Sequence, residues 1–406
     1  MLVFCFLATI VIALGVLSLR SGFSFAAYIR GEMARPLPDF TPFASVLVPC
    51  RGLEQGLREN LAALFQQNYQ GYEIIFVADN PTDPSLAVIN ELIQSDARKS
   101  SIPASIVISG PATESGQKVH NLRTAVATID HRAEVIVFVD SDARPHRTWL
   151  TSLVAPLADE NIGASTGYRW FLPVRGVFAS ELRSVWNASI ASALGADGNR
   201  NFAWGGSTAI RKSTFERLKI SERWRGSVSD DFTITRVLHE AKLPIHFVPA
   251  CLIASVDDCS ARELIEFTNR QLQITRAYAS HLWKPLLIGS LLFCAAFFGG
   301  IAIVIVRALQ GVNFVLPLAL VMTIFFLGAA KAFVRLRAVS IPLAVYGPCL
   351  RKSWTAHLFL WPIASALFLY NALHAAVSRR ITWRGITYDL KSPTEAVIIA
   401  PQSDKL

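Results

Sequence analysis

The sequence predicts an α/β domain with a mostly parallel β-sheet, joined to helices that cross a membrane. Segments typical of strands and of helices alternate between residues 45 and 139, which indicates parallel strands with right-handed helical crossovers. Long apolar stretches lie at both ends of the chain, and 52% of its 406 residues are hydrophobic. That fraction is high for an ordinary soluble domain, so we expect a globular part combined with membrane segments.

The N-terminal stretch, residues 1–20, predicts a transmembrane anchor. Residues 2–19 contain no charged side chain, and a helix of this length spans ~27 Å, close to the thickness of a bilayer core. The stretch has neither the basic start nor the cleavage site of a signal peptide, so we expect it to remain attached. Arg20, Arg30 and Arg35 follow it, which places the next domain in the cytoplasm.

The C-terminal part, residues 285–377, predicts about three further membrane helices. The candidate spans are residues 285–306, 312–330 and 355–377. A short apolar segment at 338–350 is interrupted by Pro342 and Pro348, which favours an interfacial or re-entrant piece.

The charges near these segments leave the number of passes open. Three spans would place the tail, residues 378–406, outside the cell together with Arg379, Arg380 and Arg384. That arrangement contradicts the positive-inside tendency. Either the tendency fails there or the short segment also crosses.

Composition argues against two other classes of protein. The net charge is +9, but Lys and Arg gather beside the apolar segments, which favours contact with lipid headgroups over nucleic acid. No helix-turn-helix or RNA-binding signature is present. The six cysteines form no C-x-x-C pair, so a structural zinc site is not expected.

Residues 36–283 have the composition of one α/β domain. Hydrophobic periodicity and turn residues divide the first part of this region into strands and helices. The predicted strands are residues 45–48, 73–77, 106–108, 135–139 and 208–210. The predicted helices are residues 57–66, 84–95, 119–128 and 232–241.

Polar clusters follow several of these strands. The sequence Pro49-Cys50-Arg51-Gly52 follows the first strand, Asp79 follows the second, and Asp140-Ser141-Asp142 follows the fourth. Because parallel strands end at the same edge of a sheet, these loops are expected to meet where open α/β folds bind ligands. Two acids one residue apart are often only a solvated turn, but here they can share a divalent cation with a diphosphate.

A dinucleotide-binding domain is the main competing fold. It requires G-x-G-x-x-G after the first strand, and residues 49–56 lack that pattern. A Walker motif is also absent from the sequence. We therefore expect a diphosphate to be held by a metal ion and basic side chains.

Three further segments offer candidate site residues, each with a plainer alternative. Lys118 and Asn121 are three apart at a helix start and share one face, although they could simply be a solvated helix end. Gly206-Ser207 allows a substrate to approach the backbone, or it is a turn. Asp230-Asp231 opens a helix, where an acid is either a cap or a general base.

The order of these motifs resembles that of family 2-type GT-A glycosyltransferases, enzymes with a Rossmann-like, mostly parallel sheet. Asp79, Asp140-Ser141-Asp142 and Asp230-Asp231 are followed by a Gln/Arg-rich segment and membrane helices. Among these enzymes the chain is most similar to ceramide glucosyltransferase and to bacterial hopanoid-associated glycosyltransferases. The resemblance covers most of the chain.

The resemblance implies a role for each matching residue. Asp79 would contact the uridine of a UDP-sugar, and Lys118 and Asn121 would lie beside the nucleotide. Asp140 would touch the donor, and Asp142 would bind Mg²⁺ or Mn²⁺ on the diphosphate. Asp231 would be the base for direct, inverting attack by an acceptor hydroxyl. Gly206, Ser207, Asp230 and Gln273 are candidates for the acceptor or donor loop.

One motif departs from the family pattern, which has Gln/Arg-x-x-Arg-Trp after the base. In one register Arg270 takes the first position of the motif and Gln273-Ile274 the last two, so both the Arg and the Trp are lost. In the other register Gln273 takes the first position and Arg276-Ala277 the last two, so the Arg is kept and the Trp is lost. We prefer the second because Arg276 supplies a cation for the diphosphate. The missing Trp disfavours a processive polysaccharide synthase.

Together these observations predict a multi-pass membrane enzyme with a cytoplasmic catalytic domain, in a bacterial inner membrane. It would move one sugar from a UDP-sugar to the hydroxyl of a membrane lipid such as ceramide, a hopanoid or a diacylglycerol. The bilayer helices suit a lipid acceptor better than a soluble one. The alternatives are a polyprenyl-phosphate sugar synthase and a non-catalytic membrane scaffold with the same fold.

Overall fold

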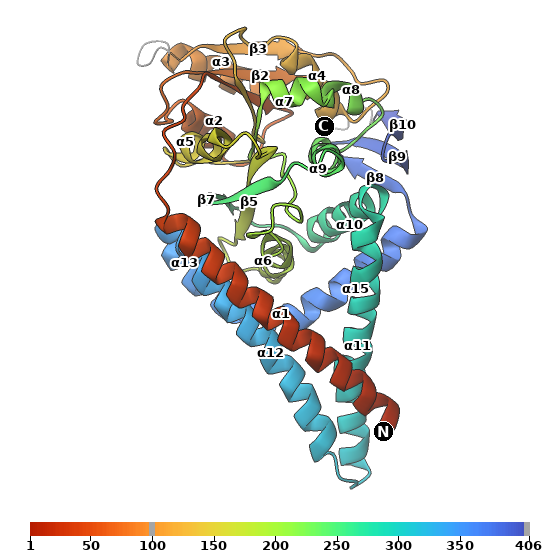
Figure 1. Ribbon diagram of the computed structural model, residues 1–406. Coiled ribbons are helices and arrows are strands. Elements are labelled where there is room, and N and C mark those ends of the chain that lie inside the picture. Colours follow the sequence, from red (N-terminus) through yellow and green to blue (C-terminus); the bar gives the residue numbers. More distant parts are fainter. Residues whose placement is uncertain (97–101, 402–406) are drawn as a thin grey trace. The chain divides into compact units, whose positions relative to one another are not determined.

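The computed structural model describes residues 1–96 and 102–401, and the chain divides into two compact units (Figure 1). The membrane unit consists of Met1–Gly31, Phe171–Ala193 and Val256–Ser378. The α/β unit consists of Glu32–Trp170, Leu194–Ser255 and the described part of Arg379–Leu406. Parts of the predicted catalytic domain, residues 36–283, therefore belong to the membrane unit, and the tail belongs to the α/β unit.

A seven-stranded sheet in the order β3-β2-β1-β4-β6-β5-β7 forms the centre of the α/β unit. Its strands are β1 (Ala44–Pro49), β2 (Tyr72–Ala78), β3 (Ala104–Ile108), β4 (Val135–Phe138), β5 (Ala164–Leu172), β6 (Thr208–Arg211) and β7 (Ile245–Val256). The first four strands are parallel, whereas β6 runs antiparallel to both β4 and β5. The predicted mostly parallel α/β fold is confirmed.

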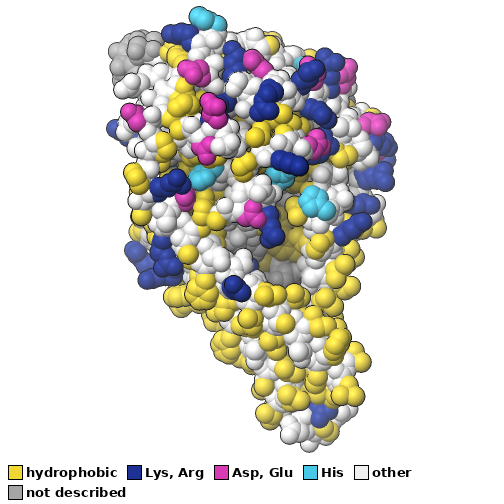
Figure 2. All heavy atoms as spheres, viewed as in Figure 1, with side chains coloured by type: hydrophobic (Ala, Val, Ile, Leu, Met, Phe, Trp, Pro, Cys, Tyr) yellow, Lys and Arg dark blue, Asp and Glu magenta, His cyan; other side chains and the backbone are white. Residues whose placement is uncertain are grey.

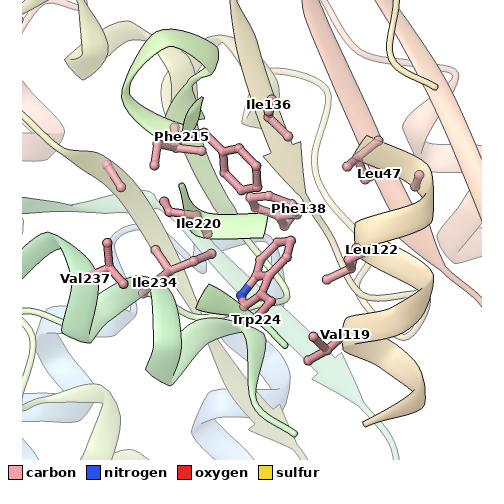
Figure 3. Close-up of a cluster of buried hydrophobic side chains, with 14 of the residues drawn as sticks. Leu47, Val119, Leu122, Ile136, Phe138, Phe215, Ile220, Trp224, Ile234 and Val237 are labelled. Atoms are coloured by element: carbon pink, nitrogen blue, oxygen red, sulfur yellow. The ribbon is translucent and has the colours of Figure 1, made fainter. Parts of the chain in front are cut away.

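Helices alternate with the parallel strands, as the sequence predicted. They are α2 (Leu57–Leu64), α3 (Ser85–Asp96), α4 (Gln117–Val126), α5 (Trp149–Val154), α7 (Lys212–Arg217), α8 (Ile220–Arg223) and α9 (Asp230–Glu240). One face of the sheet packs on α4 and α7 to α9 through a buried cluster centred on Phe138 and Trp224 (Figure 3).

Sequence reasoning did not predict strands β5 and β7. Gly167 lies within β5 and Pro249 within β7, and both residue types usually weaken a strand assignment. A Cβ added to Gly167 would lie 2.1 Å from the carbonyl oxygen of Cys251. Glycine at position 167 therefore allows β5 and β7 to approach closely, and hydrophobic periodicity in the sequence does not predict this contact.

The C-terminal tail forms a second, three-stranded antiparallel sheet within the α/β unit. Its strands are β8 (Arg380–Trp383), β9 (Ile386–Ser392) and β10 (Glu395–Pro401), in the order β10-β9-β8. Tyr388 and Leu390 are buried although they lie near the end of the chain. The tail is thus an integral part of the α/β unit.

The membrane unit contains three helices long and apolar enough to cross a bilayer. They are α1 (Leu2–Ala34), α11 (Ser280–Leu309) and α12 (Val315–Val339). Phe4 and Ala8 of α1 pack with Phe297 of α11 and Val321 of α12 in one buried cluster. On the face shown in Figure 2, hydrophobic side chains predominate over these helices, whereas charged side chains gather over the α/β unit.

Two of the three long apolar helices lie in the C-terminal half of the chain, and the third predicted C-terminal span, residues 355–377, forms shorter helices. Residues 355–377 are divided between α14 (Trp354–Phe359) and α15 (Trp361–Val377), with Pro362 in the first turn of α15. At 17 residues, α15 is shorter than the three candidate spans. Residues 338–350 contain the end of α12, a short 3₁₀ turn (Ala344–Tyr346) and most of α13 (Gly347–Lys352).

Two further helices belong to the membrane unit, α6 (Phe178–Ala191) and α10 (Ala261–Tyr278). Trp186 of α6 is fully buried and stacks on Phe368 of α15 with ring centroids 4.6 Å apart. Most of α6 is buried, so α6 is a core helix of this unit.

Candidate active site

Lys118 links acids from two different elements at the carboxyl edge of the sheet. Its ammonium lies 2.7 Å from Oδ1 of Asp140, just after β4, and 3.2 Å from Oδ1 of Asp230, the first residue of α9. Lys118 itself is the second residue of α4. The structure therefore brings three of the candidate site residues into direct contact.

Burial and charge act in opposite directions on this cluster. Burial tends to lower the pKa of Lys118, but Asp140, Asp230 and Asp231 outweigh it and raise the pKa. Burial tends to raise the pKa of Asp140, but Lys118 and Arg169 outweigh it and lower the pKa. Burial, together with the nearby Asp231 and Asp140, raises the pKa of Asp230 to about 6.

Arg169 of β5 is a site residue that sequence reasoning missed. Its guanidinium makes two 3.2 Å hydrogen bonds to the Asp142 carboxylate and lies 3.6 Å from Oδ2 of Asp140. It also lies over the ring of Trp204, 5.0 Å from the centroid. The available signal was a lone charge within the otherwise uncharged run 164–172, a pattern in which a buried cation needs a partner.

The two acids that open α9 face different partners. Oδ1 of Asp231 accepts hydrogen bonds from the Phe232 amide (2.7 Å) and the Ser229 hydroxyl, and Oδ2 accepts a long one from the Gly205 amide (3.4 Å). Asp230 is 1% exposed and pairs with Lys118, whereas Asp231 is partly exposed. The start of α9 thus has one oriented, partly exposed carboxylate and one buried carboxylate.

The segment Gly205-Gly206-Ser207 packs tightly against this acid pair. A Cβ on Gly205 would lie 2.4 Å from Oδ2 of Asp230 and 2.5 Å from the Lys118 ammonium. A Cβ on Gly206 would overlap the Trp204 ring. Ser207 is fully buried and its hydroxyl accepts a hydrogen bond from the Trp149 indole (2.8 Å), so it supports the site from within the fold.

Asp79 lies in the loop after β2, as predicted. Its Oδ2 is 3.2 Å from Nη1 of Arg51, which follows β1. The Arg51 side chain is 34% exposed and that of Asp79 14% exposed, so this pair lies at the edge of the fold. Neighbouring strands β1 and β2 bring the two residues together.

Asn121 is turned into the fold. Its Oδ1 accepts hydrogen bonds from the Ser109 hydroxyl (2.7 Å) and from the side-chain amide of Gln117 (2.8 Å), and Asn121 is 3% exposed. It therefore fixes the loop after β3 against α4. Its contribution to a nucleotide site would come through this loop.

Gln273 and Arg276 lie on α10 in the membrane unit. The Gln273 amide donates to the carbonyl of Ser378 (3.3 Å), and the Arg276 guanidinium donates to the carbonyl of Ala375. Arg276 also lies over the ring of Trp283, 5.4 Å from the centroid. Both side chains thus bind carbonyls at the end of α15.

The carboxylates of this site fit a divalent metal ion whose remaining ligands come from a bound substrate. Among the described residues no group of three or more His, Cys, Asp or Glu side chains forms a closed site. Asp140 and Asp142 offer two carboxylates, and Mg²⁺ is commonly held by one or two carboxylates together with substrate phosphates. The side chain of Asp142 is 37% exposed, and both of its oxygens are hydrogen-bonded to Arg169.

Comparison with known proteins gives this edge of the sheet a chemical context. Residues 2–396 match the family described as Glycosyl transferase family 21. The chain belongs to that family. It is therefore a glycosyltransferase, and the predicted resemblance is confirmed.

One curated relative is similar over a short part of this family 21 member. An uncharacterized glycosyltransferase of Haemophilus influenzae is 28% identical over 101 residues, which cover 25% of this chain and 36% of that protein. The chain thus spans about a third of the length of this curated relative.

Two solved structures are similar at low sequence identity. A mannosyltransferase from Pyrobaculum calidifontis, in complex with GDP-Man and Mn²⁺, has 17% identity and a TM-score of 0.48, covering 91% of this chain and 99% of its own. GalNAc-T7 with UDP, GalNAc and Mn²⁺ has 13% identity and a TM-score of 0.40, covering 54% and 44%.

Proposed function

We propose that this glycosyltransferase moves one sugar from a UDP-sugar to the hydroxyl of a membrane lipid, with inversion at the anomeric carbon. The supporting observation is the single cluster in which Lys118 and Arg169 bind Asp140, Asp142 and Asp230, with Asp231 beside it. The same chain carries three helices long enough to cross a bilayer. A ceramide-like, hopanoid-like or diacylglycerol-like acceptor suits that combination.

Different residues would bind different parts of the donor. Asp79 and Arg51 follow β2 and β1 and would contact the nucleoside, whereas Asp140 would touch the donor near its diphosphate. Lys118 holds the Asp140 carboxylate in place. Asp142 would hold Mg²⁺ or Mn²⁺, which when bound offsets the charge of the departing UDP.

Asp231 is the proposed general base. Its carboxylate is oriented by the Phe232 amide and the Ser229 hydroxyl at the start of α9. The acceptor oxygen would attack the anomeric carbon as the bond to the UDP oxygen breaks, and its proton would pass to Asp231. One displacement of this kind inverts the configuration.

The test uses the full chain in lipid nanodiscs with Mn²⁺, UDP-sugars and lipid acceptors. We expect Asp231→Asn to lower the transfer rate by about 10²- to 10⁴-fold, the typical contribution of a general base. Asp197→Asn removes an exposed turn carboxylate and serves as the matched control. Substantial residual activity of Asp231→Asn would instead favour a phosphate acceptor, which needs no strong base.

The lipid acceptor is tested in cells. Mass spectrometry of lipids from cells with and without the protein should show one glycolipid that depends on it and is lost with Asp231→Asn. An unchanged set of glycolipids would overturn the proposal of a lipid acceptor. Binding of GDP in preference to UDP would overturn the proposed donor.

A further inference from the structure

The C-terminal sheet contacts three segments that lie next to candidate site residues. The segments follow β1, precede α4 and precede α9, and all three belong to the same α/β unit as the tail. The contacts come from Arg384, Tyr388 and Thr394 of the tail. Sequence reasoning assigned this tail no chemistry.

Arg384 occupies an unusual backbone position. Together with Gly385 it forms the two-residue turn between β8 and β9, and both residues have positive φ, 50° and 78°. Glycine, asparagine or aspartate is normal at such a turn, so an arginine there suggests that its side chain is needed. Its guanidinium pairs with the Glu54 carboxylate and donates to the carbonyl of Arg51 (3.3 Å).

Glu54 connects this arginine to the Asp140-Ser141-Asp142 loop. Oε2 of Glu54 accepts a hydrogen bond from the hydroxyl of Ser141 (3.0 Å), the residue between the two acids. Ser141 is 4% exposed, so its side chain is held inside the fold. Arg384 thus reaches the two acids through a chain of two polar contacts.

Tyr388 replaces the missing side-chain cap of α4. The N-cap residue Gly116 has no side chain, and the backbone N–H of Gln117 donates instead to the Tyr388 hydroxyl (3.1 Å). The first amides of a helix need such an acceptor when they are buried. Because Lys118 is the next residue, the tail hydroxyl helps to fix the start of the turn from which Lys118 reaches Asp140 and Asp230.

The turn between β9 and β10 lies against the segment before α9. A Cβ on Gly226 would lie 2.0 Å from the carbonyl oxygen of Thr394, and Gly226 itself has a φ of 72°. Three residues later Ser229 caps the helix that begins with Asp230 and Asp231. The tail therefore contacts the loop after β1, the start of α4 and the segment before α9.

We propose that Arg384 and Tyr388 are positioning residues for the donor, which hold the Asp140-Ser141-Asp142 loop and Lys118 in the arrangement that binds a nucleoside diphosphate. This inference rests on the proposed function. According to it, the C-terminal sheet supports binding of the sugar donor. The expected signature is weaker nucleotide binding with little change in the overall fold.

The first experiment compares Tyr388→Phe with Tyr72→Phe in the full chain in nanodiscs. Each variant loses one buried hydroxyl, but the Tyr72 hydroxyl donates to the carbonyl of Leu64 (2.9 Å), outside the site contacts described here. We expect Tyr388→Phe to weaken binding of UDP with Mn²⁺ by about tenfold, the usual effect of one lost hydrogen bond. Tyr72→Phe should bind as the wild type does.

A second readout does not depend on the ligand. Hydrogen exchange of the Gln117 amide in the nucleotide-free protein should be faster in Tyr388→Phe than in the wild type or in Tyr72→Phe. In turnover, we expect KM for the UDP-sugar to rise about as much as the dissociation constant, while kcat stays within about threefold.

The second pair tests the ionic link. Arg384→Gln and Glu54→Gln should each weaken UDP binding, and the double variant should lose no more than the single ones because both act through one contact. Arg384→Lys, which keeps the charge, should recover part of the affinity. Lys391→Gln, which breaks an exposed pair with Asp389 in the same sheet, is the control and should have no effect.

The outcomes separate this inference from the proposed function. Equal UDP affinity of wild type, Tyr388→Phe and Arg384→Gln would overturn the positioning role and leave the donor assignment intact. Failure of the wild type itself to bind UDP with Mn²⁺ would overturn the donor assignment. Equal losses in Tyr388→Phe and Tyr72→Phe would also overturn the inference, because they would reflect general destabilisation.

Discussion

At the scale of single residues, the balance of charge around the two acids after β4 determines what the site can bind. Two cations, Lys118 and Arg169, are shared among Asp140, Asp142 and Asp230. Arg169 occupies both oxygens of Asp142, the proposed metal ligand. The guanidinium and an incoming metal ion therefore compete for the same carboxylate.

That competition gives the first prediction, on Arg169→Met. Removing the guanidinium leaves Asp142 without its cation, so Mn²⁺ should bind the nucleotide-free protein about tenfold more tightly, as expected from removing a like charge nearby. Electron paramagnetic resonance titration of free Mn²⁺ measures this directly. Arg211→Met, on the neighbouring strand β6, removes an arginine that donates to the Ile162 carbonyl and is the control. Unchanged or weaker Mn²⁺ binding by Arg169→Met would contradict the prediction.

The second prediction concerns pH and Asp230. Its pKa in the folded protein, about 6, lies above the ordinary value of 3.8, so the folded state holds this proton more tightly than the unfolded state. The stabilisation from the bound proton is fully present below the unfolded value and is lost as pH rises through the folded value. Relative to Asp230→Asn, the wild type should therefore lose thermal stability between about pH 4 and 6.

Thermal unfolding of both proteins in the same nanodiscs, followed across this range, provides the measurement. Asp197→Asn, which changes an exposed acid, should track the wild type at every pH. A difference between wild type and Asp230→Asn that is constant with pH would show that Asp230 does not titrate in this range.

At the scale of elements, helix starts and glycine contacts set the distances within the site. Lys118 is the second residue of α4 and Asp230 the first of α9, so small shifts of either helix would change their separation. Gly205 lies where a side chain would intrude between them. The close approach of these three segments is a property of the packing rather than of any one motif.

Gly205→Ala tests this arrangement. The added methyl group would lie within 2.5 Å of both Asp230 and Lys118, so these side chains must shift, and we expect their ion pair to be broken. We expect UDP affinity to fall by about tenfold or more, together with a lower melting temperature, because a buried charge loses its partner. Gly195→Ala adds the same methyl group where nothing lies within 4 Å, and should leave both quantities unchanged. Equal behaviour of the two variants would refute the prediction.

At the scale of the whole molecule, the tail bears on the number of membrane passes. Strands β8 to β10 belong to the α/β unit, so the chain must return to the side of the membrane on which it left that unit. We propose that α11 and α12 are the two C-terminal spans, because two passes satisfy this requirement and three do not. The arginines of the tail would then lie on the same side as the candidate site residues, which is the arrangement that the positive-inside tendency predicts for a cytoplasmic domain.

This topology predicts which introduced cysteines can be labelled in intact cells. In a background without the six native cysteines, Gln310→Cys in the loop between α11 and α12 should react with an impermeant maleimide from outside. Asn199→Cys and Lys391→Cys should react only after the cells are opened. Labelling of Lys391→Cys in intact cells would show that the tail is outside and that a third span exists.

Much of this protein was determined by its sequence alone. Hydrophobic periodicity predicted β1 to β4 and their helices, because buried parallel strands and amphipathic helices leave local patterns. The carboxyl ends of those strands predicted that Asp79, Asp140 and Asp142 would lie at one edge, and continuous apolar stretches revealed α1, α11 and α12. These signals are local, so neighbouring residues suffice to read them.

Only the tertiary structure decided the remaining features. Arg169 reaches Asp142 from β5, and β5 pairs antiparallel with β6, a pairing that no local pattern encodes. Asn121 turned inward because Ser109 and Gln117 bind its oxygen. Arg384 and Tyr388 meet Glu54 and Gln117 from the far end of the chain. Contacts between residues so distant in sequence arise only when the sheet has been assembled, since it is the packing of whole elements that brings them together.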